Sequence, residues 1–180
     1  MMHIQRLNKS SKELVSLAEL KEYMRIEHDA EDNLLRTLQR SAYEWIEQFT
    51  CRSLLTTQWR FKSLPLKEGS EIQLCLPFPS LLEIEKANHF HAPANKEAVK
   101  RYAIIEKNGM AYVCLQSKGF PVEIIYTAGF GADSDCVPEA FLHAIKVLVA
   151  YWFENREGSI CGIPDTVEIF LRPYQIRRLI

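Results

Sequence analysis

The sequence predicts an α+β fold: a mostly helical bundle of about four helices, with an antiparallel β insertion of about six strands between the second and third helices. Three observations lead to this prediction. Apolar residues recur at spacings of three and four near both ends of the chain, the middle alternates and is rich in β-forming residues, and 47% of the 180 residues are hydrophobic. That share of apolar residues is enough to bury a sizeable core.

The chain starts with a polar, mixed stretch, so residues 1–15 are predicted to form a flexible N-terminal arm. Ser16 and Glu19 then have the spacing of a capping box, in which each side chain satisfies a backbone amide at the start of a helix. A short helix over about 17–25 follows from this signal.

A second, longer helix is predicted from about Asp29 to Thr50 or Arg52. Acidic residues in its first turn suit the positive end of the helix dipole. Its apolar side chains recur with helical spacing over about twenty residues: Leu34, Leu38, Ala42, Trp45 and Phe49.

Residues 55–128 read as the β insertion, because short alternating runs are separated by Pro, Gly and Asn. Asn108-Gly109, between two of these runs, is a strong hairpin signal. The predicted strands are 56–62, 71–76, 81–88, 102–107, 111–116 and 122–127.

A third helix begins at Val137-Pro-Glu, with proline at its favoured first position, and ends at Gly158. Its broad apolar face predicts a central place in the core. Pro164 opens a last helix over Asp165–Leu171. Residues 16–180 are therefore predicted to form a single domain interrupted by the insertion.

Charge and cysteine content argue against several classes of protein. With 22 basic and 23 acidic residues, the chain lacks the basic excess from which general DNA affinity comes. Five widely spaced cysteines form neither a disulfide framework nor a zinc motif. No signal peptide or membrane-length apolar run is present, which favours the cytoplasm and no membrane contact.

Each candidate for chemistry has a simpler structural interpretation, so we predict no catalytic residue, cofactor or metal. His89 and His91 share a strand face but lack further ligands. Glu44 and Glu47 fall on the polar face of the second helix, where solvated charge is expected. Gly129-Phe-Gly131 lacks the third glycine of a nucleotide fingerprint and reads as a tight turn.

Aromatic residues are the remaining candidates, since bases of single-stranded DNA stack on them. Trp45 and Trp152 lie on apolar helical faces and are predicted to pack in the core. Trp59 is left open, because it belongs to the insertion and an exposed position there is also compatible with the pattern.

Three stretches together resemble the head–tail connector (adaptor, head-completion) family of tailed phages, which also occurs in prophages and gene transfer agents. The first stretch comprises the first two predicted helices and includes Ala42-Tyr-Glu-Trp-Ile-Glu-Gln-Phe-Thr-Cys-Arg. The second combines Ile125-Tyr-Thr-Ala-Gly-Phe-Gly with Leu148-Val-Ala-Tyr-Trp-Phe-Glu-Asn-Arg-Glu in the third predicted helix. The third is Pro173-Tyr-Gln-Ile-Arg-Arg-Leu near the end of the chain. One departure is Cys51, where family members commonly carry glycine after the helix.

The resemblance implies a structural virion protein rather than an enzyme. Such a protein forms a homo-oligomeric ring of about twelve subunits between portal and tail, extends the DNA channel at head completion, and receives a stopper or tail-completion protein. It would be made in the host cytoplasm, lie at the virion head–tail junction and touch DNA only transiently. The second and third helices are expected to supply most of the ring interface.

The C-terminal segment is the predicted portal contact, because aromatic, apolar and arginine side chains of this kind often anchor interfaces. Its residues are Arg172, Tyr174, Ile176, Arg177, Arg178 and Leu179. Two other functions stay open at this point. One is a small DNA-binding or packaging accessory protein of a prophage, and the other is a hydrolase that would use Cys75, Cys114 or His91.

Overall fold

The computed structural model describes residues 3–8, 12–92, 95–156 and 162–176. The chain divides into two compact units, each built from two stretches of sequence. The β unit comprises residues 1–10 and 52–130, and the helical unit comprises residues 11–51 and 131–180. Each unit is described by itself.

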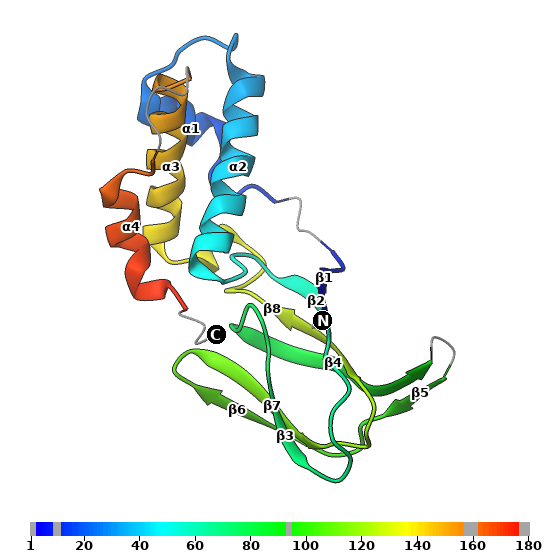
Figure 1. Cartoon of the computed structure of the whole chain (residues 1–180). Helices are drawn as coiled ribbons and strands as arrows, with labels where there is room; N and C mark the ends of the chain where they lie inside the picture. Colours follow the sequence, from blue (N-terminus) through cyan, green and yellow to red (C-terminus); the bar gives the residue numbers. More distant parts are fainter. Residues whose placement is uncertain (1–2, 9–11, 93–94, 157–161, 177–180) are drawn as a thin grey trace. The chain divides into compact units, whose positions relative to one another are not determined.

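The described residues of the helical unit form four α-helices and two short 3₁₀ turns, and Figure 1 labels the four helices. The helices are α1 (Leu17–Met24), α2 (Asp32–Thr50), α3 (Glu139–Glu154) and α4 (Asp165–Leu171). Its buried side chains come from all four helices, and α3 contributes Phe141, Ala144, Ile145, Leu148 and Val149. The predicted central position of this helix is confirmed, although Trp45, Trp152 and Phe153 keep partial exposure.

Local signals at the helix ends agree with the sequence prediction. Ser16 caps α1, and the reciprocal bond from the Ser16 amide to the Glu19 carboxylate measures 2.8 Å. Arg25 ends α1 in the left-handed conformation, with its amide bonded to Glu22 and that of Ile26 bonded to Lys21. This pattern is the Schellman motif.

The β unit consists of two antiparallel sheets. The five-stranded sheet has the order β1-β2-β8-β4-β5 and the three-stranded sheet the order β3-β7-β6. The strands are β1 (His3–Arg6), β2 (Thr57–Lys62), β3 (Glu71–Cys75), β4 (Leu81–Ala92), β5 (Asn95–Ala98), β6 (Tyr102–Lys107), β7 (Met110–Gln116) and β8 (Val122–Ala128).

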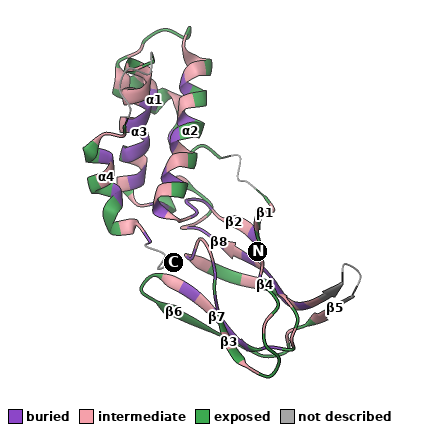
Figure 2. Ribbon diagram, in the orientation of Figure 1, coloured by how far each residue is buried: buried purple, intermediate pink, exposed green. Residues whose placement is uncertain are grey.

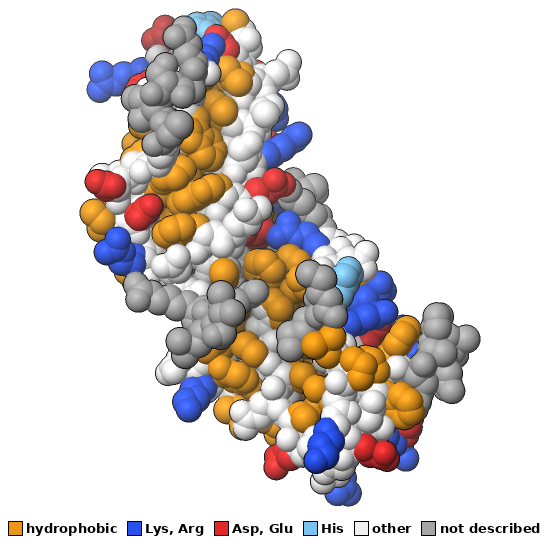
Figure 3. Space-filling view, viewed as in Figure 1, with side chains coloured by type: hydrophobic (Ala, Val, Ile, Leu, Met, Phe, Trp, Pro, Cys, Tyr) orange, Lys and Arg blue, Asp and Glu red, His pale blue; other side chains and the backbone are white. Residues whose placement is uncertain are grey.

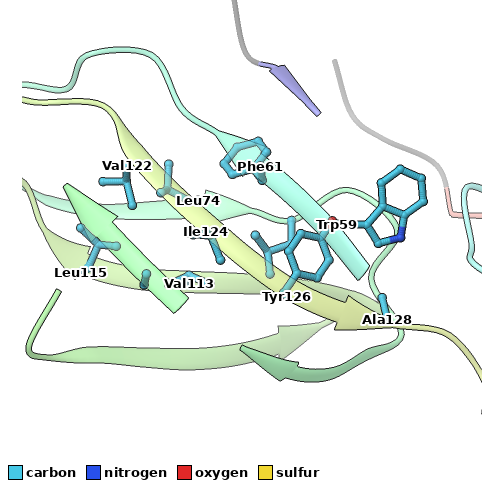
Figure 4. Close-up of a cluster of buried hydrophobic side chains, with 11 residues drawn as sticks. Trp59, Phe61, Leu74, Val113, Leu115, Val122, Ile124, Tyr126 and Ala128 are labelled. Carbon is cyan, nitrogen blue, oxygen red and sulfur yellow. The ribbon is translucent and has the colours of Figure 1, made fainter. Parts of the chain in front are cut away.

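One apolar cluster takes side chains from both sheets (Figure 4). Ile124 and Tyr126 of β8 are fully buried in it, and the Tyr126 hydroxyl donates to the Pro77 carbonyl. Trp59, whose position the sequence leaves open, is 5% exposed. Its ring stacks on Phe78 with centroids 4.2 Å apart, and its Nε1 donates to Ser53 at 2.9 Å.

Two turns depend on particular backbone conformations. Asn108 and Gly109 both have positive φ, at 53° and 72°, and join β6 to β7. The hairpin predicted from the sequence is therefore present, and two positive φ values are typical of a type I′ turn. Gly129 has φ 144°, and an added Cβ would lie 2.5 Å from the Leu55 carbonyl oxygen, so the tight-turn interpretation of Gly129-Phe-Gly131 agrees with the structure.

The α+β class and the antiparallel insertion are confirmed, but the prediction of a mostly helical chain is wrong. Strands hold 31% of the residues against 35% for helices. The described part of the insertion has seven strands instead of about six, and the additional strand is β5. The predicted N-terminal arm includes β1, which pairs with β2 through the register Ile4↔Phe61.

Candidate interaction surfaces

The C-terminal segment lies against the C-terminal end of α2. Tyr174 packs on Phe141 with ring centroids 4.7 Å apart. The Ile176 amide donates to the Thr50 carbonyl at 3.1 Å, and Ile176 is 7% exposed. Two of the predicted contact residues therefore belong to the packing of the helical unit itself.

Arg172, in contrast, is exposed in the 3₁₀ turn that follows α4. Arg177, Arg178 and Leu179 lie outside the described residues. The predicted portal contact thus divides into an exposed arginine, two packed anchors and a stretch that the structure does not describe.

The helical unit also exposes a row of ring side chains, Tyr23, His143 and Phe170, which we call the aromatic strip. The His143 ring lies nearly perpendicular to the rings of Tyr23 and Phe170, with centroid distances of 6.3 and 5.1 Å. Ile169, beside Phe170, is 62% exposed. On the visible face of this unit, hydrophobic side chains gather over α3 (Figure 3).

On the β unit, β6 is the most exposed strand. All six of its residues are exposed (Figure 2), including Tyr102, Ile104 and Ile105 at 41%, 46% and 45%. β6 lies at one edge of the three-stranded sheet. Apolar edge strands of this kind commonly pair with other chains.

In the five-stranded sheet, a buried carboxylate contacts cations from two other strands. The Glu123 side chain is 1% exposed, and its carboxylate lies 2.5 Å from the Lys96 Nζ and 3.3 Å from the Lys62 Nζ. The Arg60 Nε lies 3.8 Å away. Burial alone would raise the pKa of Glu123. Hydrogen bonds and charge attraction from Lys96 and Lys62 outweigh this effect, so the pKa lies below the ordinary value of 4.5.

Sequence reasoning missed this group because its members stand far apart in the chain and form no motif. Lys62, Lys96 and Glu123 come from β2, β5 and β8. The only sequence signal is a carboxylate inside an apolar strand, which requires a partner when it is buried.

The groups considered for chemistry lie in structural settings. His89 is 2% exposed, and the side chain of His91 is outside the description. Glu44 is exposed as predicted, but Glu47 is 2% exposed, so the expectation of solvated charge is wrong for Glu47. Burial at this end of α2 extends beyond the apolar stripe to the polar residues Glu47 and Thr50, and the Thr50 carbonyl accepts a bond from the Ile176 amide.

The remaining searches apply to the described ranges only. Within them, no three His, Cys, Asp or Glu side chains are placed to hold a metal ion together. Cys114 is buried and Cys75 is exposed. None of the helices described is both long and apolar enough to cross a membrane.

These features define a two-unit α+β protein with exposed apolar surfaces on each unit. The model of the head completion protein family matches residues 13–162. The chain therefore belongs to the head completion protein family. Membership supports a structural role as a head–tail connector.

Solved structures show the same fold. A chain from the neck of an empty GTA particle, computed with C6 symmetry, aligns with a TM-score of 0.81 at 20% identity, over 99% of this chain and 97% of that chain. A chain from the virion of a native gene transfer agent (GTA) particle gives 0.81 at 20% identity, over 98% and 97%. A third, from the neck of a native GTA particle computed with C12 symmetry, gives 0.78 at 18% identity, over 99% and 97%.

No curated protein gives a significant match to the sequence.

Proposed function

We propose that this chain is an adaptor subunit that forms a homo-oligomeric ring between the portal and the tail and extends the DNA channel at head completion. The observation that carries the proposal is the family match over residues 13–162. The fold supports it, since the chain aligns over nearly its whole length with proteins from particle necks, one of them computed with C12 symmetry. A ring of about twelve copies accords with that symmetry.

The exposed apolar surfaces favour a subunit that works in an assembly. Large apolar patches on soluble proteins usually mark interaction sites. The aromatic strip around Phe170 and the strand β6 provide one such surface on each unit. A closed ring needs two different surfaces per subunit, because each copy meets its two neighbours through different faces. The hydrophobic side chains over α3 support the expected role of α2 and α3 in one of them.

The ring would join the portal on one side and a stopper or tail-completion protein on the other. For the portal we propose Arg172, Tyr174, Ile176, Arg177, Arg178 and Leu179. Tyr174 and Ile176 would hold the start of this segment on the helical unit, and the three arginines would meet an acidic portal surface. Assembly would take place in the host cytoplasm, and the finished ring would lie at the virion head–tail junction.

The test uses particles produced without this chain. Purified chain is added back, and the necks are imaged by electron microscopy. We expect a ring of about twelve copies on DNA-filled heads, together with restored tail attachment. Particles that join heads to tails equally well without the chain, or necks that do not contain it, would overturn the proposal.

The portal contact needs its own variants. A chain that ends at Ile176 keeps the packed anchors and lacks Arg177, Arg178 and Leu179, and Arg172→Ala removes the exposed arginine. We expect each change to weaken co-sedimentation with portal rings, while Lys67→Ala, an exposed site on the β unit, leaves it unchanged. Equal portal binding by all three variants would contradict the assignment of this segment.

A further inference from the structure

The three-stranded sheet of the β unit has two edges, β6 and β3, with β7 between them. Both edge strands pair antiparallel with β7 and so run in the same direction. We infer that the β6 edge of one copy pairs in parallel with the β3 edge of the next copy, which joins the sheets of neighbouring subunits. The inference rests on the proposed ring and names one of its interfaces.

The first support is the continuation of the core face onto β6. Val113 and Leu115 of β7 are buried in the apolar cluster of the β unit. Their register partners on β6 are Ile104 and Tyr102, and these lie on the same face but remain exposed. The apolar face of the sheet therefore extends one strand beyond the part that is covered within the subunit.

The second support is that the first four residues of β6 carry no charge or proline and its pairing with β7 has no bulge, while the charged residues Glu106 and Lys107 lie at the hairpin end of the strand. Edge strands usually carry charges, prolines or bulges that prevent pairing with other chains. The first four residues of β6 are Tyr-Ala-Ile-Ile, and its register with β7 is continuous. A strand of this composition is suited to accept another strand.

The hydrogen-bond pattern shows which backbone groups face outward. Asn108-Gly109 forms a two-residue hairpin, so the flanking pair Lys107↔Met110 is a hydrogen-bonded pair, as are alternate pairs beyond it. The bond from the Leu76 amide to the Ala111 carbonyl, on the other side of β7, has the matching phase. The N–H groups of Tyr102 and Ile104 consequently point away from β7.

By the same alternation, Ile72 and Leu74 bond to β7, and the N–H groups of Glu71, Gln73 and Cys75 point away from it at the β3 edge. In a parallel pair, one residue bonds to the two residues that flank its register partner. With Ile104 opposite Leu74 of the partner subunit, the Ile104 amide donates to the carbonyl of the partner subunit's Gln73. Both strands then present complementary outward groups.

This register also matches side chains on the two faces. Tyr102 and Ile104 come beside Ile72 and Leu74 of the partner subunit, which continues the apolar face across the junction. On the opposite face, Arg101 comes beside the partner subunit's Glu71, and both residues are exposed. A cation at the start of one strand thus meets an anion at the start of the other.

A second copy is the occupant that these observations favour. Pairing of β6 with β6 of another copy would use one edge twice and give a closed dimer, whereas β6 with β3 leaves one edge free on each side for further addition. The complementary charges, Arg101 and Glu71, stand on the two different edges.

The experiment measures self-association of the full chain by sedimentation velocity and native mass spectrometry over a concentration series. Ile104→Pro removes the outward N–H of β6 without touching the β6–β7 ladder, and Gln73→Pro does the same at the β3 edge. We expect each to lower the association constant about tenfold or more. Ile104→Ala is the matched control that keeps the amide, and it should retain most of the association.

A mixture of the two proline variants gives the sharpest readout. Each variant keeps one working edge, so the mixture should form dimers and nothing larger, at concentrations at which each variant alone is monomeric. If a proline variant does not fold, the charge pair replaces it: Arg101→Glu and Glu71→Arg should each weaken association, and the double exchange should restore it.

Several results would overturn the inference. They are a wild-type chain that is monomeric at every concentration, loss of association in Ile104→Pro but not in Gln73→Pro, and larger oligomers in the mixture. The ring in particle necks is measured separately by the add-back experiment. A ring that forms there from Ile104→Pro subunits would reject the edge pairing and leave the proposed function intact.

Discussion

Gly129 occupies a position that no other residue fits. Its φ is 144°, and a Cβ there would lie 2.5 Å from the Leu55 carbonyl oxygen and 2.8 Å from the Thr56 amide nitrogen. Both neighbours are backbone atoms and cannot rotate away. Gly129→Ala should therefore lower the free energy of unfolding by about 3 kcal/mol, measured by urea titration.

Gly69→Ala is the matched control for this prediction. Gly69 also has positive φ, at 74°, but nothing lies within 4 Å of its added Cβ. Only backbone strain remains there, and the loss should be about 1 kcal/mol. Equal losses at the two sites would show that the close approach at Leu55 relaxes without cost.

Cys51 ends α2 in the left-handed conformation, with φ 54°. The family resemblance places glycine at this position, and the backbone supplies the reason, since only glycine adopts this region without steric cost. Cys51→Gly should raise the free energy of unfolding by about 0.5–1 kcal/mol.

Cys51→Ala separates the backbone effect from loss of the thiol, because alanine keeps the Cβ. When both variants are compared with the wild type by urea titration, Cys51→Ala should not raise the free energy of unfolding. A gain of similar size from alanine would mean that the Cys51 side chain, and not its φ, is the unfavourable feature.

At the scale of elements, Glu123 connects three strands through its cations. Glu123→Gln keeps the shape but removes the negative charge that Lys62 and Lys96 face. We expect a loss of about 2 kcal/mol at neutral pH. Lys118→Gln is a suitable control, because the Lys118–Glu97 ion pair is largely exposed and such pairs contribute little.

The pH dependence of stability gives a further prediction for the same group. The pKa of Glu123 in the folded chain lies below its ordinary value of 4.5. Its contribution is therefore complete above pH 4.5 and decreases as the pH falls toward the folded-state pKa. Urea titrations at a series of acidic pH values should show a shallower decline in Glu123→Gln than in the wild type, and parallel declines would exclude Glu123 as a source of acid sensitivity.

Elements that carry a clear local signal, such as a helix cap or a turn pair, were predictable from the sequence, and short polar strands were not. The capping box located α1, Pro164 located α4, and Asn108-Gly109 located the β6–β7 hairpin. The strands β1 (HIQR) and β5 (NKEA) carry few β-forming residues. They exist because neighbouring strands supply their hydrogen bonds, and a local pattern contains no information about such partners.

The same limit applies to the candidate surfaces. The sequence predicted Tyr174 and Ile176 as part of a portal contact, but only the fold shows that they contact Phe141 and Thr50 of their own unit. The exposed edge at β6 was predicted as a strand, yet its place at the margin of a sheet depends on pairing between residues far apart in sequence.

At the scale of the whole molecule, the insertion can interrupt the helical sequence because its two ends lie together. The register pairs Thr57 with Ala128, and the Phe130 amide bonds to the Leu54 carbonyl at 3.1 Å. The chain thus enters and leaves the β unit at neighbouring points. Sequence reasoning located the insertion at 55–128, and the compact unit that contains it spans 52–130 together with the first ten residues.

The overall charge of the molecule leads to the last prediction. The formal net charge is −1, and DNA affinity gained through phosphate contacts requires cations that release counterions. A subunit that lines a DNA channel, as we propose for this chain, should bind duplex DNA weakly at this net charge, so gel shifts of the isolated chain at about 150 mM salt should show no stable complex. A packaging accessory protein would give a complex that weakens steeply as salt rises. Such a salt-dependent complex would favour the accessory function over the adaptor, because a conduit has to let DNA slide past it.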